Sequence, residues 1–231
     1  MSRTRPEDRL DQLVHAAVQV FIRRGYRRTQ MADVARAMGV APGTLYLYVQ
    51  GKEALFDFVI QHAFRDHGAL PPPRFPIATP PAGATLKHVR QRLAQEGRIP
   101  SLEAALARRR VTDPRAEFET IVRDLYRFVA EKRLGIVLIE RSALDWPELA
   151  ELFFKDFRRG FLRRLTQYLE RRVAQKRLRP IPHPAAAARL INETVAWFAM
   201  HRHGDVDAAI IDDAAAETTV VDALVNAFAK E

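Results

Sequence analysis

Apolar residues recur at intervals of three and four along most of the chain, which is the spacing that gathers them on one face of an α-helix. In the first part of the chain, such stripes predict four helices, over residues 10–24, 31–38, 42–48 and 52–68. Gly25 and Gly39 follow the first two stripes and are predicted to end them. Thr29 precedes the second stripe, so its hydroxyl is predicted to cap that helix by accepting a backbone N–H. Pro42 opens the third helix, where proline is tolerated.

Six of the 14 prolines lie between Leu70 and Thr85, and proline at this density forms neither helix nor central strand. The segment 70–84 is therefore predicted to be an extended, fairly stiff connector. Helical spacing returns after it and predicts helices over residues 84–96, 101–110, 114–133, 135–144, 147–178, 183–203 and 206–229. We find no period-two alternation and no internal repeat. The sequence therefore predicts an all-α fold, with one domain over residues 1–52 and a larger one over residues 53–231.

The stretch from Met31 to Val49 has the organisation of a helix-turn-helix. Ala35 supplies the small residue that a steep helix crossing needs, and Gly39 can adopt the left-handed conformation of a tight turn. The apolar residues predicted to point into the shared core are Val34, Val40, Leu45 and Val49. The residues left to face outward are Ala41, Pro42, Gly43, Thr44, Tyr46, Leu47 and Tyr48. Such a face suits entry into a DNA major groove.

With these elements in register, residues 25–55 resemble the DNA-binding signature of the tetracycline-repressor (TetR) family of bacterial transcription regulators. The matching elements are Phe21, Gly25, Thr29, Val34-Ala35, Gly39-Val40, Gly43-Thr44-Leu45-Tyr46 with Tyr48, and Lys52-Glu53 with Leu55. The resemblance implies an N-terminal three-helix DNA-binding domain and a larger C-terminal helical domain for ligand binding and dimerisation. It also implies a ligand-responsive regulator, a repressor that leaves a palindromic operator when an effector binds.

Carried over position by position, the resemblance implies a set of residues that contact double-stranded DNA. They are Thr29, Pro42, Gly43, Thr44, Tyr46, Leu47, Tyr48 and Lys52. Thr44 would contact a base or a phosphate, and the Tyr46 hydroxyl would contact a phosphate. Thr29 and Lys52 would contact phosphates at the starts of the second and fourth helices. Pro42 has no backbone N–H and cannot donate one to DNA.

The resemblance further implies an effector cavity in the second domain, apolar with a few polar anchors, for a small hydrophobic or aromatic molecule. Candidate wall residues are Trp146, Phe153, Phe157, Trp197 and Phe198, and candidate anchors are Arg123, Tyr126, Glu140, Asn192 and His201. The last two helices would build a four-helix bundle in a homodimer, with Ile191, Val195, Val221, Leu224 and Phe228 at the interface. The alternative is a DNA-binding regulator without a small-molecule effector, controlled by a protein partner or by its own concentration.

The formal net charge of +9 favours an anionic partner such as nucleic acid. The strongly basic run 155–179 has two interpretations, a solvated arginine face on a long helix or a second DNA-binding surface, and we favour the first. The absence of cysteine excludes a disulfide scaffold, a thiolate nucleophile and any Cys-ligated metal.

No cofactor, no metal and no enzymatic activity are expected. His201 and His203 lie two positions apart, so on a helix they point away from each other and do not share an ion. The sequence contains no glycine-rich phosphate loop and no nucleophile elbow. It also has neither a signal peptide nor a run of about 18 apolar residues, so we expect a soluble, cytoplasmic protein.

Overall fold

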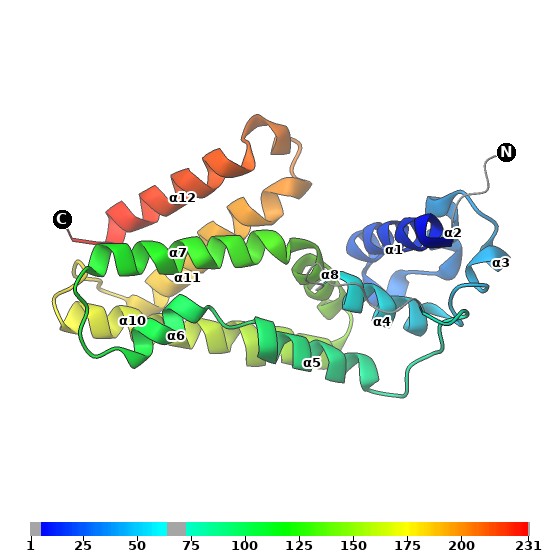
Figure 1. Ribbon diagram of the computed structural model, residues 1–231, viewed down its shortest axis with the longest axis horizontal. Helices are drawn as coiled ribbons and strands as arrows, with labels where there is room; N and C mark the ends of the chain where they lie inside the picture. The colour runs from blue at the N-terminus through cyan, green and yellow to red at the C-terminus, as the bar shows by residue number, and fades with distance from the viewer. Residues whose placement is uncertain (1–5, 64–72, 231) are drawn as a thin grey trace. The chain divides into compact units, whose positions relative to one another are not determined.

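The computed structural model describes residues 6–63 and 73–230, and within these residues the regular secondary structure is helical, with isolated β-bridges and no strand (Figure 1). The all-α prediction is therefore confirmed. The end of the helix predicted over residues 52–68, and the first residues of the connector, fall outside the described part. None of the described helices is long and apolar enough to cross a membrane.

Contacts divide the chain into two compact units. The first unit holds the chain up to Ala94 together with Leu134–Phe153, and the second holds Gln95–Arg133 and Phe154–Glu231. This division by packing does not coincide with the boundary at residue 52, which stays a prediction about function.

The first unit contains α1 (Pro6–Arg28), α2 (Met31–Met38), α3 (Pro42–Leu45), α4 (Lys52–Ala63), most of α5 (Ala84–Glu96), α8 (Arg133–Ala143) and α9 (Pro147–Ala150). Its core is built from the apolar stripes that the sequence shows, and Leu13, Phe21, Val34 and Leu55 are fully buried. The predicted end of the first stripe is also confirmed, because the backbone of Gly25 leaves the helical region, at φ +75° and ψ 171°.

The predicted cap of α2 is wrong. Gln30 takes the N-cap position, and its backbone N–H donates to Asp33 Oδ2 over 3.0 Å. Thr29 is 2% exposed, and its hydroxyl donates to the carbonyl oxygen of Gly25 over 2.7 Å. Asp33 serves as the acceptor at the start of the helix, so the threonine hydroxyl is free to satisfy the carbonyl that the Gly25 kink leaves without a helical partner.

The second unit contains α6 (Pro100–Ala107), α7 (Pro114–Glu131), α10 (Arg159–Ala174), α11 (Pro184–Ala199) and α12 (Asp213–Phe228). A π-helix, η1 (Glu151–Arg158), precedes α10, and two 3₁₀ turns, η2 (His201–Gly204) and η3 (Ala208–Ile210), precede α12. Helix α11 packs against α7, α10 and α12. The core of this unit includes Phe118, Ile121, Leu165, Tyr168 and Ile191.

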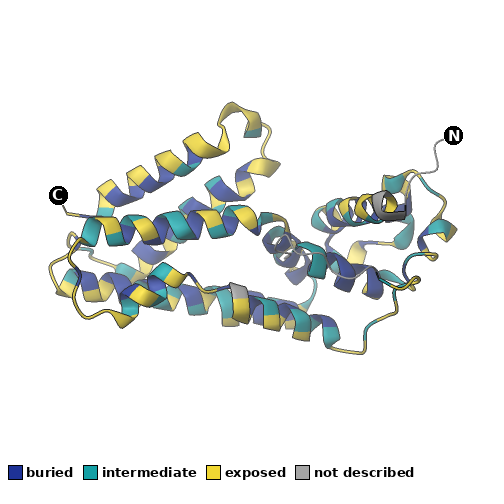
Figure 2. Cartoon of the chain, in the orientation of Figure 1, coloured by how far each residue is buried: buried dark blue, intermediate teal, exposed yellow. Residues whose placement is uncertain are grey.

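Helix α12 begins later than predicted, at Asp213 rather than at residue 206. Asp212 caps it, since its side chain accepts a hydrogen bond from the backbone N–H of Ala215 over 2.8 Å. The residues before the cap form the 3₁₀ turn η3 instead. Figure 2 shows α12 with buried residues along one side and exposed residues along the other, as expected for an amphipathic helix.

The residues predicted at a dimer interface belong to the core of a single subunit. Ile191, Val195, Val221 and Leu224 are each at most 5% exposed within one chain, and Phe228 packs edge-on against Phe118 with ring centroids 6.0 Å apart. The assignment of these apolar stripes to a second subunit is therefore wrong for one chain's own packing, because α7 and α10 cover the stripe of α11 and α7 and α11 cover that of α12. The exposed apolar residues of this region are Leu190, Trp197, Val206, Ile210 and Ile211.

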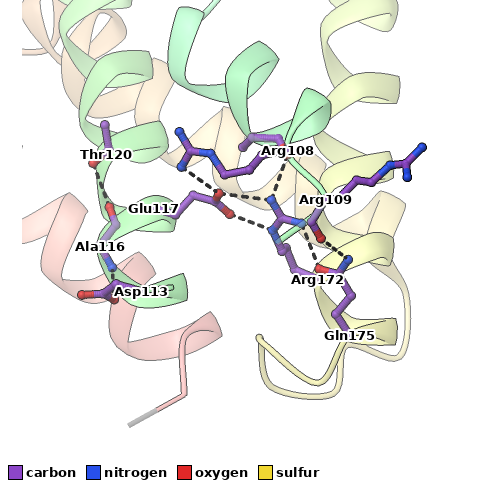
Figure 3. Close-up of polar contacts among 9 residues, drawn as sticks. Arg108, Arg109, Asp113, Ala116, Glu117, Thr120, Arg172 and Gln175 are labelled. Atoms are coloured by element: carbon purple, nitrogen blue, oxygen red, sulfur yellow. Dashed lines mark hydrogen bonds and ion pairs between the residues drawn. The ribbon is translucent and has the colours of Figure 1, made fainter. Parts of the chain in front are cut away.

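The interpretation of residues 155–179 as a solvated arginine face fails at Arg172, which is fully buried in α10 (Figure 3). Its guanidinium donates from Nε to Glu117 Oε1 over 2.7 Å and from Nη2 to Glu117 Oε2 over 3.1 Å. The remaining donors reach Gln175 Oε1 over 2.9 Å and the carbonyl oxygen of Ala105 over 2.8 Å. A buried arginine needs such a shell, because an unpaired charge in the core is costly. The pair ties α10 to α7.

Candidate nucleic-acid interface

The turn between α2 and α3 is a tight one set by Gly39, as predicted. Gly39 has φ +67° and ψ 31°, the left-handed conformation that residues with a side chain avoid. Its N–H donates to the carbonyl oxygen of Arg36 over 3.1 Å, and the N–H of Val40 donates to that of Ala35 over 3.0 Å. This pair of bonds ends α2 and turns the chain directly into α3.

The inner side of the helix-turn-helix is apolar. Val34, Leu45 and Val49 are fully buried, as expected, whereas Val40, which was also expected in the core, is half-buried. Helix α3 is short, Pro42–Leu45, and a turn continues it as far as Tyr48. The core therefore fixes the orientation of a segment that is too short to be stable as an isolated helix.

The outer side of the same segment is open to solvent. Pro42 and Gly43 are exposed, Thr44 is half-buried, Tyr46 is 50% exposed and Leu47 is 68% exposed. An exposed leucine and an exposed tyrosine on one short turn leave apolar and hydroxyl groups available to base edges and phosphates. The structure thus brings these five predicted DNA-contact residues together on one surface, which we call the recognition surface.

Two predicted phosphate contacts have other roles in this structure. The Thr29 side chain is buried and bonded to Gly25, so it supports the kink and offers no exposed group to a phosphate. The Lys52 ammonium donates to the carbonyl oxygen of Arg27 over 3.1 Å and lies 4.8 Å from the centroid of the Tyr26 ring. Lys52 is half-buried at the start of α4 and holds the end of α1.

An ionic cluster that the sequence analysis did not find joins α1 to α2. Asp33 is 9% exposed and its carboxylate contacts Arg24 Nη1 at 3.0 Å and Arg36 Nη1 at 3.3 Å. Both arginine side chains are more than half exposed, so each retains surface for a second anion. The sequence signal that could have revealed this role of Asp33 is its place three positions after Gln30, which is the spacing of a capping box. Glutamine is an unusual N-cap residue, which hides the signal.

The proline-rich connector pairs with Tyr48 and Gln50, directly after the recognition surface, which the sequence did not predict. The N–H of Ile77 donates to the carbonyl oxygen of Tyr48 over 2.8 Å, and the N–H of Gln50 donates to that of Ile77 over 2.9 Å. These bonds make a parallel bridge between Val49 and Ile77. The Phe75 ring also packs edge-on against Tyr48, with centroids 5.4 Å apart. Tyr48 is therefore held from the connector side.

The structure distributes the predicted effector residues over both units. Trp146 lines a cavity of about 300 Å³ in the first unit, and Trp197 lines a smaller one of about 130 Å³ in the second. Glu140 lies in α8 of the first unit, half-buried. His201, which is exposed, belongs to the second unit.

The other candidates of the second unit make local contacts. Arg123 pairs with Glu119 at 2.7 Å and with Glu217 at 3.2 Å, and its pKa is raised above the usual value, chiefly by the hydrogen bond to Glu119. Tyr126 is 2% exposed, its hydroxyl donates to the carbonyl oxygen of Phe198 over 3.4 Å, and burial raises its pKa. Asn192 is half-buried, and its side-chain amide donates to Glu193 Oε1 over 3.0 Å. Phe157, in η1, is also half-buried.

Comparison with known proteins now gives these features a context. Residues 13–59 match the model of the N-terminal domain of "Bacterial regulatory proteins, tetR family". The chain is also 45% identical over 42 residues to the fatty acid metabolism regulator protein of Bacillus subtilis. That match covers 18% of this chain, and the chain spans 22% of the length of this curated relative.

Solved structures extend the likeness in fold over nearly the whole chain. The ketosteroid transcriptional regulator of Mycobacterium tuberculosis superposes with a TM-score of 0.53 at 14% identity, covering 96% of each chain. A TetR-family transcriptional regulator of Streptomyces coelicolor gives a TM-score of 0.52 at 22% identity, and the match covers 93% of this chain and 87% of the Streptomyces chain. At such identities the likeness shows the fold alone. Residues 13–59 therefore match the N-terminal DNA-binding domain of the tetR family of bacterial regulatory proteins, and the chain shares its all-α fold with these solved structures.

Proposed function

We propose that this protein is a sequence-specific DNA-binding regulator that inserts the recognition surface into the major groove. The observation that carries the proposal is the outward face of α3 and its turn, where Gly43, Thr44, Tyr46 and Leu47 stand on a fully apolar inner side. Glycine permits close approach of the backbone to DNA, and Tyr46 and Thr44 supply hydroxyl groups for phosphates and bases. The net charge of +9 favours such a partner.

We also propose that the protein acts as a homodimer on a palindromic operator. One segment as short as α3 reads a few base pairs, so two copies placed one or more helical turns of DNA apart supply affinity and symmetry. Exposed apolar residues on α11 and beyond it support an interface there: Leu190 is 57% exposed, Trp197 is 45% exposed and Ile210 is 75% exposed. We propose these exposed residues for the interface in place of the residues of α11 and α12 that the sequence indicated, which are buried within one chain.

Regulation by a small hydrophobic or aromatic effector is the third part of the proposal. An effector releases DNA when it binds better to a conformation that holds the two recognition surfaces at the wrong spacing. Release by an effector would give a repressor. The alternative, control by a protein partner or by concentration alone, predicts DNA affinity that no small molecule changes.

DNA binding is tested by selecting bound sequences from a random pool with the purified protein at fixed salt. We expect an enriched palindrome, and no enrichment by well-folded protein would contradict the proposal. On the selected site, Tyr46→Phe should weaken binding, because the hydroxyl is lost while the ring remains. Lys52→Ala should flatten the slope of log affinity against log salt by about one, and an unchanged slope would remove Lys52 from the DNA interface. The matched control is Lys87→Ala, an exposed lysine of α5.

The dimer is tested by size-exclusion chromatography with light scattering. Leu190→Glu places a charge in the proposed interface and should give monomers. Leu144→Glu is the control, because Leu144 is 69% exposed and belongs to the first unit. A Leu190→Glu protein that remains dimeric would refute this interface.

A further inference from the structure

The first unit contains a cavity of about 300 Å³ beside the end of α1. Its walls come from three parts of the sequence: Tyr26 at the end of α1, Glu53 and Phe56 in α4, and the residues around Trp146 at the start of α9. The end of the connector and the start of α5 form a further wall, through residues between Pro80 and Leu86. A cavity of this size accommodates a small organic molecule.

The electrostatic character of the cavity is acidic. Glu53 and Glu148 belong to its walls, and none of the described residues that line it is basic. Glu53 Oε1 also accepts a hydrogen bond from the Tyr26 hydroxyl over 3.3 Å. The pKa of Tyr26 is raised to about 12 by burial and, secondly, by the negative charge of Glu53. Within the part of the chain that the structure describes, the residues that line the cavity thus carry two carboxylates and no cation, and the Lys52 ammonium lies beside it on the Tyr26 ring.

Three aromatic residues of the cavity wall pack against one another. The Tyr26 ring stacks on Trp146 with centroids 4.7 Å apart, and Phe56 lies 4.7 Å from Tyr26 and 5.8 Å from Trp146. Aromatic rings attract cations through their negative faces. The cluster already receives one cation, because the Lys52 ammonium lies 4.8 Å from the Tyr26 centroid.

We propose that this cavity binds an organic cation, a quaternary or protonated amine carried on an aromatic or alkyl body. The body packs against Trp146 and Phe56, while Glu53 and Glu148 compensate the positive charge. Both requirements are met by one ligand class, whereas a neutral apolar molecule would gain nothing from the two carboxylates and an anion would be repelled by them.

The site is linked to Tyr48, the residue directly after the recognition surface, by a short stretch of backbone and its hydrogen bonds. The connector lines the cavity at Pro80, and three residues earlier Ile77 is hydrogen-bonded to Tyr48 and Gln50. The N–H of Thr79 also donates to Gln50 Oε1 over 2.9 Å. A ligand that displaces residues 80–83 therefore pulls on the bonds that hold Tyr48. This consequence for DNA affinity rests on the proposed function, whereas the cation site itself does not.

The test uses the full chain and benzyltrimethylammonium as the probe, titrated by isothermal calorimetry. We expect saturable binding at one site per chain, with no saturable binding of benzenesulfonate, an anion of similar size. The chain has two tryptophans, so a Trp197→Phe protein, used for spectroscopy alone, reports the emission of Trp146. That emission should change with the same dissociation constant. An absence of saturable binding, or equal binding of the sulfonate, would overturn the proposal.

Variants assign the site to the two carboxylates. Glu148→Gln and Glu53→Gln should each raise the dissociation constant of the probe roughly fivefold, the scale of a partly exposed charge pair. Glutamine at position 53 still accepts the Tyr26 hydroxyl, so the wall stays intact. Glu131→Gln removes an equal charge from an exposed position in the second unit and should leave the constant unchanged. If that control weakens binding as much as the cavity variants, the effect is long-range charge and the site is refuted.

The regulatory consequence is measured separately on the selected DNA. Benzyltrimethylammonium should weaken binding of the wild-type protein to DNA, and should have less effect on the Glu53→Gln/Glu148→Gln double variant. Calorimetric binding of the cation without DNA binding would refute the proposed function and uphold the site. DNA binding without calorimetric binding of the cation would refute the cation site and uphold the proposed function.

Discussion

The buried pair of Glu117 and Arg172 allows a quantitative prediction, for the substitution Glu117→Gln. Arg172 is fully buried, and two of its four hydrogen bonds go to Glu117 (Figure 3). Glutamine keeps nearly the same shape, but it removes the negative charge and turns an NH₂ group toward one guanidinium donor. The positive charge of Arg172 then stays in the core with Gln175 and the Ala105 carbonyl oxygen as its remaining acceptors. Arg108 Nη1, 3.8 Å from Glu117 Oε2, loses its partner as well.

Removing one partner of a buried ion pair costs roughly 3–5 kcal/mol. The retained amide oxygen of glutamine still accepts one hydrogen bond, so the lower end, about 3 kcal/mol, is expected. For a chain of this length, each kcal/mol lowers the melting temperature by roughly 2–4 °C, which gives a loss of about 6–12 °C. Replacing both members by apolar residues, Glu117→Leu with Arg172→Met, removes the stranded charge and should recover most of the loss.

The assay is urea and thermal unfolding followed by circular dichroism. Its matched control is Glu193→Gln, which breaks the pair of Arg189 and Glu193 on α11, whose N–O distance is 2.9 Å. Both of those side chains are nearly half exposed, so the control should cost about 0.5 kcal/mol or less. The reasoning would be refuted by a Glu117→Gln protein that loses no more stability than this control, or by a double variant that is less stable than the single one.

Three further outcomes are expected. Gly25→Ala should lower the free energy of unfolding by about 1–3 kcal/mol, because φ +75° with ψ 171° excludes most side chains and the new Cβ would lie 2.9 Å from Asp145 Oδ2. Gly39→Ala, with nothing near its Cβ, should cost about 1 kcal/mol in the same urea titration, and equal losses would contradict the difference. Burial lowers the pKa of His203 below its usual value, so below about pH 6.5 the unfolded chain binds more protons than the folded chain. The free energy of unfolding therefore decreases as the pH is lowered. His203→Gln should reduce that loss in unfolding curves recorded between about pH 7 and about pH 5, and an unchanged pH dependence would contradict it. Ile77→Pro removes the N–H that donates to the Tyr48 carbonyl oxygen, so it should weaken DNA binding several-fold while the helicity is retained. Ile77→Val keeps this N–H and should leave DNA binding unchanged.

The sequence predicts the helices well because each one has a continuous apolar stripe, and the stripe is the face that the fold buries. The stripe of α7 is an example, with Phe118, Ile121 and Val122 at most 1% exposed. The same stripes do not say which helix covers which. This is why Ile191 and Val195 were assigned to a second subunit, although helices of the same chain cover them.

Polar contacts between distant segments lie beyond sequence reasoning for a related reason. Arg172 stands in a run of arginines, and although helical spacing places it on the same face as Tyr168 and Leu169, that spacing does not say which group pairs with its charge. Its burial follows from Glu117, 55 positions away, arriving on α7. The cap of α2 failed on a smaller scale, because Thr29 and Gln30 are adjacent and the kink at Gly25 decided which of them caps the helix.

The candidate recognition surface was predicted because its signals are local: a turn glycine, an alternation of inward and outward residues, and a short proline-initiated helix. The connector was interpreted as a spacer for the opposite reason. Proline density indicates an extended backbone but not its partner, and an extended backbone has free N–H and C=O groups that pair wherever a matching edge is close. Here that edge is the turn after α3, from Tyr48 to Gln50.

The pairing of Ile77 with Tyr48 and Gln50 has a consequence for protein engineering. Chimeric regulators are made by joining the DNA-reading part of one chain to the sensing part of another, and residue 52 or the end of α4 would be the obvious junction. A junction there would transfer the helix-turn-helix without the connector segment around Ile77 that hydrogen-bonds to Tyr48 and Gln50. A functional transplant from this chain should therefore carry residues 73–79 along with the helix-turn-helix, and grafts that end at Ala63 should read DNA less tightly than grafts that include this strip.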